Sequence, residues 1–384
     1  MSSSIAWIAW PPNATESNVM SDVRFMRAAL ALARRGLGRT WPNPSVGCLI
    51  VKDGVVVGRG WTQPGGRPHA EAEALARAGR NAKGADAYVT LEPCCHHGKT
   101  PPCTDALIAA GIRHAIVAIE DPDPRVSGKG VAALRTAGIV VDTGLCADEA
   151  RDVNAGFLSN VARGRPLITL KLATSLDGRL AVASGESRWI TGEPARARGH
   201  LLRATNDAVM VGSGTVLADD PELTCRLPGL GDHSPVRVVI DGSMRVPLTA
   251  RLVADARQTP TWFIVRHGIG GERRTALASC GVEVIDVPAG ATGETDLAAA
   301  LAALGSRGIT RVLVEGGARL AAALVRGGLV DRIAWFHAPS LIGGDGRPAL
   351  DALGVTAPGE APHFVRVGVE AIGDDMLETL QRAV

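Results

Sequence analysis

The sequence predicts two α/β domains in one chain, and the first of them is predicted to have three α/β/α layers. The chain has 384 residues, and a single domain usually holds roughly 100–200. Hydrophobic residues make up 46%, which is enough apolar side chain for two cores. Helical patterns alternate with short apolar runs along both halves, which is typical of α/β folds.

The composition narrows the classes of partner. The 41 basic residues nearly balance the 39 acidic ones, and aromatic residues are only 3%. A nucleic-acid binder normally carries a basic surface or a stacking platform, so we expect no nucleic-acid partner. A small molecule is the expected ligand. A homo-oligomer is compatible with the sequence, but nothing in it sets the oligomeric state.

Location follows from hydropathy and cysteine usage. The longest early apolar stretch, Ile5 to Trp10, is far shorter than the roughly 20 residues that span a bilayer, and it lacks the pattern of a signal peptide. No membrane association is therefore expected. The seven cysteines concentrate near residues 94–103, which favours metal binding or catalysis in a reducing compartment. We predict a cytoplasmic protein.

The first domain is expected at residues 20–146. Residues 1–19 form a polar lead that we expect to be dispensable, and a helical pattern begins near Ser21 and stops at Gly36. Asp53-Gly54 lies between two apolar runs and predicts a β-hairpin. Further strands are predicted at 87–91, 115–119 and 139–142, and helices at 70–78, 104–110 and 131–137.

The second domain is expected at residues 167–384, after a polar and partly helical linker at 147–166. It begins with an apolar strand at 167–172 and continues with the same alternation. Strands are predicted near 208–212, 236–241, 261–265, 282–287, 311–315 and 332–337, and helices near 194–204, 296–305 and 318–326.

Three short fragments of the first domain carry metal chemistry. They are His69-Ala70-Glu71 at a helix start, Glu92-Pro93-Cys94 after a strand, and Pro101-Pro102-Cys103 at another helix start. One histidine and two cysteines supply three ligands and leave a fourth position of a catalytic zinc open for water. Zinc lowers the pKa of that water to near neutrality. We therefore predict that His69, Cys94 and Cys103 bind Zn²⁺.

Glu71 is the predicted proton carrier. A carboxylate two residues from a zinc-binding histidine can lie beside the metal without binding it, take a proton from the water and deliver it to the leaving amine. This His-x-Glu and Pro-Cys pattern is typical of zinc nucleobase deaminases. A structural zinc site with His96 or His97 as a fourth ligand is the alternative, but it leaves Glu71 without a role. Cys95 is expected to be a bystander.

The long loop between Cys94 and Cys103, with the sequence Cys-Cys-His-His-Gly-Lys-Thr-Pro-Pro-Cys, resembles the bifunctional deaminase–reductase family of riboflavin biosynthesis. Asn43-Pro44-Ser45-Val46-Gly47 and the stretch Lys171 to Thr191 are also similar to that family. The resemblance covers nearly all of 20–384, and it implies a cytidine-deaminase-like first domain. Cys95 departs from the pattern, where a serine is expected.

This resemblance implies the substrate of the first domain, a diaminohydroxypyrimidinone that carries a ribosylamino 5′-phosphate. Ammonia would be lost from the pyrimidine by hydrolysis. Asn43 would contact the pyrimidine, and an ordinary turn residue is the alternative for it. His96, His97 and Lys99 are candidate contacts of the pyrimidine or phosphate, and a solvated polar loop is the alternative for each of them.

Evidence from the residues alone is weaker in the second domain. Gly212-Ser213-Gly214-Thr215 and Glu315-Gly316-Gly317 each follow an apolar strand, and backbone amides at such turns can hold phosphate. Each could also be an ordinary tight turn. The family resemblance implies a dihydrofolate-reductase-like fold that binds NADPH and reduces the ribosyl group to ribityl. Lys171 is the candidate catalytic residue.

By the same resemblance, two sets of residues divide the reductase site. The candidate NADPH contacts are Ala173, Trp189, Thr215, Asp219 and the turn from Gly317 onward. The candidate substrate contacts are Ser187, Arg203, Leu223, Arg226 and Glu315. Without the resemblance, Trp189 reads as core packing and Arg203 as a solvated helix face.

Two other functions compete with the bifunctional enzyme. One is a nucleoside or tRNA deaminase with an accessory domain, which the balanced charge and the second glycine-rich domain disfavour. The other is a zinc-stabilised binding module without catalysis. Loss of ammonia release on replacing Glu71 would separate an enzyme from a binding module.

Overall fold

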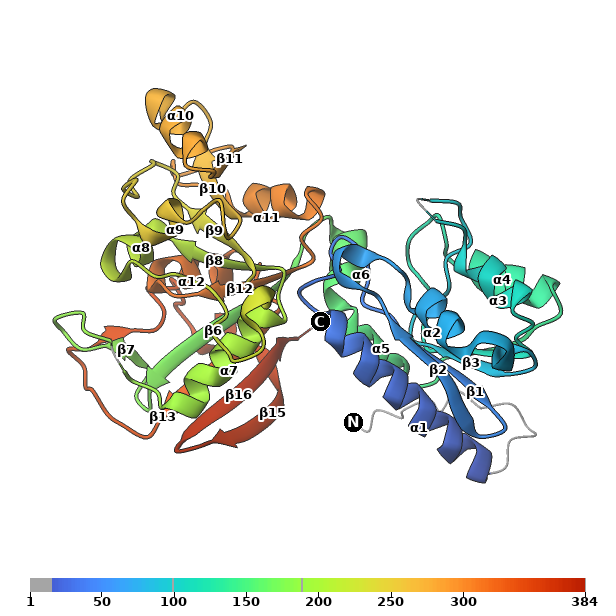
Figure 1. The fold of residues 1–384 in the computed structure, drawn as a ribbon. Helices are drawn as coiled ribbons and strands as arrows, with labels where there is room; N and C mark the ends of the chain where they lie inside the picture. Colours follow the sequence, from blue (N-terminus) through green and yellow to red (C-terminus); the bar gives the residue numbers. More distant parts are fainter. Residues whose placement is uncertain (1–15, 99, 188, 384) are drawn as a thin grey trace. The chain divides into compact units, whose positions relative to one another are not determined.

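The structure is a computed structural model that describes residues 16–98, 100–187 and 189–383 (Figure 1). The chain divides into two compact units. Unit 1 holds the chain up to Gly36 and Pro44–Asn154, and unit 2 holds Leu37–Asn43 and Ala155–Val384. Among the described residues, no helix has both the length and the hydrophobicity needed to cross a membrane.

Unit 1 is built on a five-stranded sheet of order β2-β1-β3-β4-β5. The predicted hairpin joins β1 to β2 at Asp53 and Gly54, which have φ of 50° and 76°. Positive φ at both turn residues matches the right-handed twist of a two-residue hairpin. The other strands run parallel to one another. The strands are β1 Gly47–Lys52, β2 Val55–Trp61, β3 Asp86–Val89, β4 His114–Val117 and β5 Val140–Thr143.

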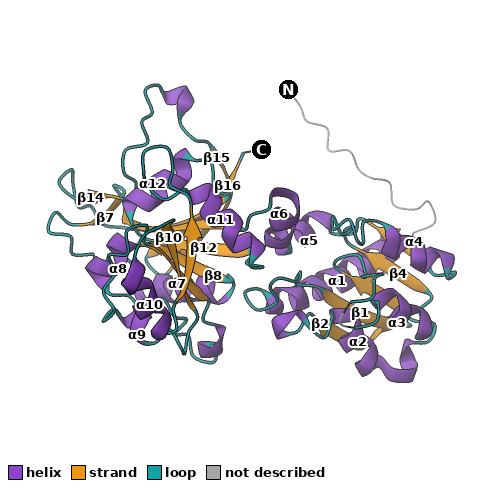
Figure 2. Cartoon of the chain, turned by 90° about the horizontal axis from the view of Figure 1, so that it is seen from above, coloured by secondary structure: helices purple, strands orange, loops and turns teal. Residues whose placement is uncertain are grey.

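Glycines on β1 and β2 show that helices cover both faces of this sheet. A Cβ at Gly47 would lie 1.9 Å from a backbone oxygen of α1, and a Cβ at Gly60 would lie 2.2 Å from one of α2. Gly60 pairs with Cys48, the neighbour of Gly47, so the two glycines face opposite sides. The three layers are therefore present (Figure 2). The helices are α1 Glu16–Ala33, α2 Ala70–Ala78, α3 Cys103–Ala109, α4 Lys129–Thr136 and α5 Ala147–Val153.

Unit 2 contains a nine-stranded sheet of order β11-β10-β9-β8-β12-β6-β13-β16-β15. The strands from β11 to β13 are parallel, and β16 and β15 extend the sheet antiparallel. The long strands are β6 Leu167–Ser175, β8 Ala208–Gly212, β9 Val236–Ile240, β10 Thr261–Arg266, β11 Glu283–Val287, β12 Arg311–Glu315, β13 Arg332–Ala338, β15 Phe364–Ile372 and β16 Asp375–Arg382. A small separate sheet pairs β7 Arg179–Ala181 with β14 Arg347–Pro348.

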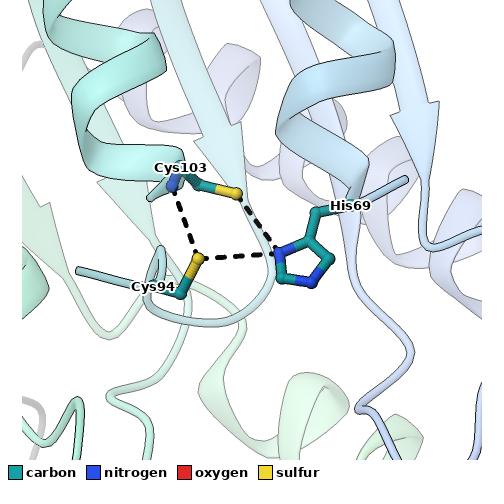
Figure 3. A group of neighbouring side chains, drawn as sticks. All are labelled: His69, Cys94 and Cys103. Atoms are coloured by element: carbon teal, nitrogen blue, oxygen red, sulfur yellow. Dashed lines mark hydrogen bonds between the residues drawn. The ribbon is translucent and has the colours of Figure 1, made fainter. Parts of the chain in front are cut away.

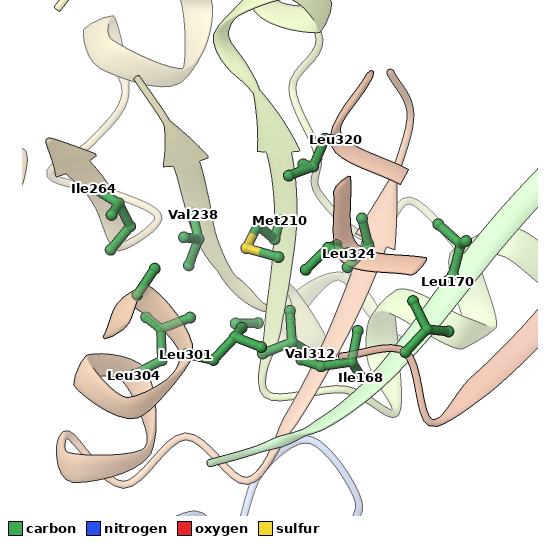
Figure 4. Packing of buried hydrophobic residues seen from close by; sticks show 14 of the residues in the cluster. Ile168, Leu170, Met210, Val238, Ile264, Leu301, Leu304, Val312, Leu320 and Leu324 are labelled. Atoms are coloured by element: carbon green, nitrogen blue, oxygen red, sulfur yellow. The ribbon is translucent and has the colours of Figure 1, made fainter. Parts of the chain in front are cut away.

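Both faces of the central parallel strands are buried, as expected for a doubly covered sheet. Met210 and Ile264 pack with Leu301 and Leu324 in one cluster (Figure 4). Their chain neighbours Val209 and Phe263 belong to a second cluster on the other face. The helices of unit 2 are α6 Ala155–Arg163, α7 Glu193–Ala204, α8 Ser213–Asp219, α9 Arg251–Ala254, α10 Gly271–Ser279, α11 Leu297–Ser306 and α12 Ala318–Arg326.

The segment Leu37–Asn43 belongs to unit 2 although α1 and β1 of unit 1 flank it. The Trp41 ring meets the Trp262 ring edge-on, with centroids 6.4 Å apart. Arg39 Nη2 donates to Asp232 Oδ2 at 3.0 Å. A Cβ at Gly308 would lie 2.8 Å from Pro42 Cβ. Unit 2 is therefore made from two separate stretches of chain, which the sequence pattern does not predict.

Some predicted elements differ from the structure. The first helix starts at Glu16 rather than near Ser21. The expected linker 147–166 consists mostly of α5 and α6. β15 and β16 were not predicted, although Val365, Val367 and Val369 of β15 alternate with polar residues or glycine, which is typical of a strand.

Candidate active sites

Two helix starts and one loop bring the predicted zinc ligands together. His69 directly precedes α2, Cys103 is the first residue of α3, and Cys94 lies in the loop after β3. Their ligand atoms all lie within 4.8 Å of one another (Figure 3). His69 Nδ1 is 3.6 Å from Cys94 Sγ and 3.3 Å from Cys103 Sγ.

The donor set fits zinc. Tetrahedral zinc binds sulfur at about 2.3 Å and nitrogen at about 2.1 Å, which places the two ligand atoms about 3.6 Å apart. The two His–Cys distances match this edge. A hydrogen bond from Cys103 lowers the pKa of Cys94 to about 4, so Cys94 favours the thiolate that a metal requires. Three ligands leave one tetrahedral position for water.

Glu71 lies in the first turn of α2, beside this group. Its side chain is 3% exposed and lies close enough to Cys103 for a side-chain hydrogen bond. Burial raises the pKa of Glu71 to about 7, and the nearby charge of Cys94 acts in the same direction. A divalent cation beside it would act in the opposite direction. A carboxyl group in this position can carry a proton at neutral pH.

The alternative ligands lie outside the metal-binding group. Among the described residues, only His69, Cys94 and Cys103 form such a group. Cys95 Sγ instead faces the carbonyl of Arg125 at 3.9 Å. His96 is half-buried, and its Nδ1 has no hydrogen-bond partner among the described residues. Lys99 lies outside the described residues.

Glu92 fixes the loop that carries Cys94, a role that the sequence did not predict. Its buried carboxylate accepts hydrogen bonds from the backbone N–H groups of Asp121, Gly128 and Val131 at 2.9–3.1 Å. A Cβ at Gly130 would lie 2.2 Å from the Pro93 carbonyl, so α4 packs directly against this loop. The position of Glu92 directly before Pro93-Cys94 in the motif could have indicated this role.

Asn43 ends the segment that belongs to unit 2, directly before Pro44, where unit 1 resumes. Its backbone N–H donates to the Thr40 carbonyl at 2.9 Å. The structure therefore places this candidate pyrimidine contact in the chain stretch that joins the two units.

In unit 2, three charged side chains meet on neighbouring strands and a helix. Glu315 of β12 pairs in register with Lys171 of β6. Arg203 of α7 donates to Glu315 Oε2 at 2.9 Å through Nη2 and to Oε1 through Nε. The side chains of Arg203 and Glu315 are 14% and 12% exposed. The pair is therefore bidentate and largely removed from water.

Burial and the neighbouring charges act on the pKa values of Lys171 and Glu315 in opposite directions. Burial lowers the pKa of Lys171, although Glu315 opposes that shift. Burial alone would raise the pKa of Glu315, but Arg203 and Lys171 outweigh it and the pKa is lowered. Lys171 Nζ also lies 5.7 Å from the centre of the Phe336 ring. A partly buried lysine with a lowered pKa is suited to proton transfer.

A cavity of about 1400 Å³ lies within unit 2. The two glycine-rich turns predicted from the sequence line it, Gly212–Thr215 before α8 and Gly317 before α12. Gly316 and Gly317 have φ of 88° and 81°, so this turn favours glycine. Four of the predicted contacts line the cavity: Ser187, Thr215, Asp219 and Gly317.

The other predicted contacts of unit 2 do not line this cavity. Trp189 is 68% exposed and lies against the Arg196 guanidinium at 4.6 Å. Ala173 lies on β6 and packs against a small cluster that contains Phe336. Leu223 is buried with φ of 57°. Arg226 is exposed and donates to Glu222.

Arg203 connects the charged group to the loop that carries Leu223 and Arg226. Its Nη1 donates to the Thr224 carbonyl at 3.0 Å, while the Arg226 N–H donates to His200 Nδ1 at 3.3 Å. Two elements missed by the sequence reasoning also line the cavity, the turn after β9 that carries Ser243 and Arg245, and the loop 290–296. The dipeptide Asp241-Gly242 directly after an apolar strand could have indicated this turn.

Comparison with known proteins identifies both units. Residues 20–119 match the cytidine and deoxycytidylate deaminase zinc-binding region, and residues 166–377 match the RibD C-terminal domain. The riboflavin biosynthesis protein RibD of Escherichia coli K12 is 44% identical over 368 residues, which cover 93% of this chain and 98% of that protein.

The chain belongs to the RibD family.

Solved structures agree with this assignment over both units. Acinetobacter baumannii RibD, in its form 1, gives a TM-score of 0.86 at 39% identity and covers 95% of this chain and 100% of its own. A deaminase/reductase from Thermotoga maritima gives 0.83 at 33% identity, covering 95% and 99%. The predicted fold class and bifunctional activity are thus confirmed. This RibD-family enzyme is a zinc-dependent deaminase and an NADPH-dependent reductase of riboflavin biosynthesis that acts on small molecules.

Proposed function

We propose that unit 1 deaminates 2,5-diamino-6-ribosylamino-4(3H)-pyrimidinone 5′-phosphate and that unit 2 reduces the product, 5-amino-6-(5-phosphoribosylamino)uracil. The observation that carries the first half is the His69, Cys94 and Cys103 group with Glu71 beside it. The Thermotoga maritima relative is described as acting on the corresponding diaminopyrimidine and uracil phosphates. The long loop between Cys94 and Cys103 suits a substrate larger than a free base.

In unit 1, His69, Cys94 and Cys103 would hold zinc, which supplies a water of lowered pKa. Glu71 takes a proton from that water as its oxygen adds to the ring carbon that bears the amine. Glu71 then delivers the proton to the departing nitrogen, and ammonia leaves. Asn43 orients the pyrimidine, and His96 and Lys99 contact the pyrimidine or the phosphate.

In unit 2, the cavity would hold NADPH, which would supply the hydride for C1′ of the ribosylamino group, so that this group opens to a ribityl chain. Lys171 donates a proton to the ring oxygen that is released, which its lowered pKa favours. Glu315 and Arg203 hold the substrate's ribosyl phosphate end, with Ser187, Leu223 and Arg226 as further contacts. Thr215, Asp219 and the turn from Gly317 contact the cofactor, and Ala173 and Trp189 complete its site.

We further propose the domain limits 20–146 for the deaminase and 167–384 for the reductase, with 147–166 as the connection and 1–19 dispensable. A cytoplasmic location is supported by the seven cysteines, which are all unpaired thiols. The net charge of +2 supports small-molecule substrates without a nucleic-acid partner. A homo-oligomer is compatible with all of this.

One assay tests both halves. The purified chain is given the diaminopyrimidinone ribosylamino phosphate and NADPH, and ammonia release and NADPH absorbance are followed together. We expect ammonia first and NADPH oxidation afterwards, with no oxidation before deamination. Ammonia release without any NADPH oxidation would refute the proposal for unit 2. Oxidation that precedes ammonia release would refute the proposed order.

A further inference from the structure

The loop 220–226 of unit 2 has a strained backbone. It follows α8 and carries two of the candidate substrate contacts, Leu223 and Arg226. Asp220 and Leu223 have φ of 40° and 57°, in the left-handed region that residues other than glycine rarely adopt. Such residues persist only where the surrounding structure holds them, and they are often found at ligand-binding sites. The groups that hold this loop are therefore candidates for a role in binding.

Residues of β9 and of the turn before it hold one part of the loop. Arg237 of β9 is fully buried, and its Nη1 donates to the Glu222 carbonyl at 3.3 Å. The Cys225 N–H donates to Ser234 Oγ at 3.1 Å. The side chain of Leu223 packs in the hydrophobic cluster that also contains Val209 and Phe263. These contacts anchor the loop to the core of unit 2.

The helix α7 holds the loop with two residues that lie one turn apart. Arg203 Nη1 donates to the Thr224 carbonyl at 3.0 Å. His200 Nδ1 accepts from the Arg226 N–H at 3.3 Å. Because residues three apart lie on the same face of a helix, the two side chains reach the loop together. They hold the segment Thr224–Arg226 at both of its ends, one through a carbonyl and the other through an N–H.

The surroundings of His200 favour its neutral ring. Its side chain is partly buried, and this burial lowers the pKa of His200. The charges of Arg203 and Arg226 act in the same direction, while Glu315 opposes them. A neutral imidazole has one acceptor and one donor nitrogen, so the bond from Arg226 makes Nδ1 the acceptor and assigns the proton to Nε2. A lysine or an arginine could not replace it here, because neither has an acceptor nitrogen.

We infer that His200 is a positioning residue of the reductase, which fixes the Arg226 backbone so that the loop is preorganised for the ribosyl phosphate substrate. The acceptor Nδ1 has this role, and the donor Nε2 has no part in it. The inference rests on the substrate contacts proposed above for Leu223 and Arg226. Preorganisation lowers the cost of ordering the loop when the substrate binds, so loss of this hydrogen bond should raise KM without changing kcat.

Three substitutions of His200 separate the roles of the two ring nitrogens. Asparagine can place Oδ1 near the position of Nδ1 and accept from Arg226, glutamine places its amide nearer to that of Nε2, and leucine removes both functions. The full zinc-loaded chain is assayed with 5-amino-6-(5-phosphoribosylamino)uracil and NADPH. We expect the KM for this uracil to rise about 3- to 10-fold in His200→Leu and His200→Gln, the range for one uncharged hydrogen bond. His200→Asn should restore KM to within about twofold.

Internal controls separate positioning from a general loss of structure. The kcat of the reductase, the KM for NADPH and ammonia release by unit 1 should stay within about twofold in all three variants. Arg198→Leu is the matched control on the same helix, because Arg198 pairs with Glu370 of β15 and not with the loop. It should leave the KM for the uracil unchanged.

Hydrogen exchange measures how firmly the loop is held without any turnover. In the absence of substrate, the amides of a peptide that covers 220–226 should exchange faster in His200→Leu and His200→Gln, and at the unaltered rate in His200→Asn. Unchanged exchange in His200→Leu would overturn the inference. An asparagine variant as weak as the leucine variant would also overturn it, and rescue by glutamine alone would assign the role to Nε2 instead.

The same data distinguish failure of the inference from failure of the proposed function. Faster exchange in His200→Leu with an unchanged KM, while the unaltered chain is active, would overturn the inference and would place the loop outside the substrate site. An unaltered chain that oxidises no NADPH with the uracil would refute the proposed reductase function, and the inference would fail with it.

Discussion

The two active sites of this enzyme are built in opposite ways. The deaminase site takes His69, Glu71, Cys94 and Cys103 from a span of 35 residues, and two of its ligands lie at helix starts. The reductase site brings together Lys171, Arg203 and Glu315, whose outer members are 144 residues apart. Its cofactor cavity is lined from Leu180 to Asp351.

The difference follows from where each reaction obtains its charge. A zinc ion concentrates the positive charge of a deaminase at one point, so the protein needs three ligands and one carboxylate around it. The reductase must hold an extended cofactor and a phosphorylated substrate together, so its groups spread along the ends of many strands. A single substitution in the compact deaminase site should therefore abolish its activity, while a single substitution in the extended reductase site should reduce its activity only partly.

The largest expected effect is that of Cys103→Ala. Removing one of three ligands should abolish zinc binding and ammonia release, because the remaining two cannot hold the metal at catalytic occupancy. The reductase should retain its activity with the deaminated substrate. Metal analysis and the two separate assays check this. Cys95→Ser is the matched control, and equal loss of zinc in it would show that Cys95 is a ligand.

Glu71→Gln should separate metal binding from chemistry. Zinc content should remain, but ammonia release should fall roughly 10²- to 10⁴-fold, the usual contribution of a general acid–base group. Rates are to be compared at saturating substrate, so that kcat is measured. A variant with full activity would remove Glu71 from the mechanism. Loss of zinc instead would give Glu71 a structural role.

Lys171→Met tests the catalytic group of the reductase. Methionine matches the length and apolar stem of lysine, so Phe336 and β6 should keep their packing. The kcat for NADPH oxidation should fall roughly 10²-fold or more if Lys171 transfers a proton. Deamination should not change. A rise in KM with unchanged kcat would instead make Lys171 a binding residue.

Arg203→Lys should give a partial loss, as expected for an extended site. Lysine keeps the charge but loses the bidentate pair with Glu315 and the bond to the Thr224 carbonyl. We expect kcat/KM of the reductase to fall about 10- to 100-fold. Arg198→Lys on the same helix is the control, since Arg198 pairs with Glu370 at the surface. Equal effects of both changes would contradict the role of Arg203.

The smallest effect is expected for Glu92→Gln. The Glu92 carboxylate accepts from three backbone N–H groups, and the NH₂ group of glutamine cannot accept from any of them. We therefore expect the free energy of unfolding of unit 1 to fall by about 1–3 kcal/mol. Zinc affinity should fall as well, by about 10-fold or more, because the loop of Cys94 loses its anchor. Denaturant unfolding and competition with a chelator measure the two. Unchanged zinc affinity would confine Glu92 to stability.

The same contrast decides how much the sequence could predict. The zinc ligands and Glu71 form a local pattern whose spacing sets the chemistry, so they could be named directly. α2 was predicted with the limits Ala70 and Ala78 that the structure gives it. Glu315 and Arg203 needed a family resemblance, because their pairing depends on strand order and on α7. No local signal records a contact across 112 residues.

Other features could not be predicted for physical reasons. β15 does carry an alternation, because Val365, Val367 and Val369 are separated by polar residues or glycine, but these valines are exposed rather than packed in a core. Trp189 lies largely in solvent against Arg196, so core packing, which was the alternative interpretation of this residue, is wrong. Arg245 and Arg266 become neighbours of one cavity only after β9 and β10 pair in register.

The segment Leu37–Asn43 has a consequence for how this enzyme can be divided. The chain passes from unit 1 to unit 2 and back before β1, and passes again to unit 2 after Asn154. A gene cut only at the 147–166 connection would therefore give a reductase fragment without Trp41 and Pro42. Such a fragment would expose the faces of Trp262 and Gly308 that these residues cover. The two activities are thus encoded in an interleaved order, and a clean separation requires rejoining the ends around residues 37–43.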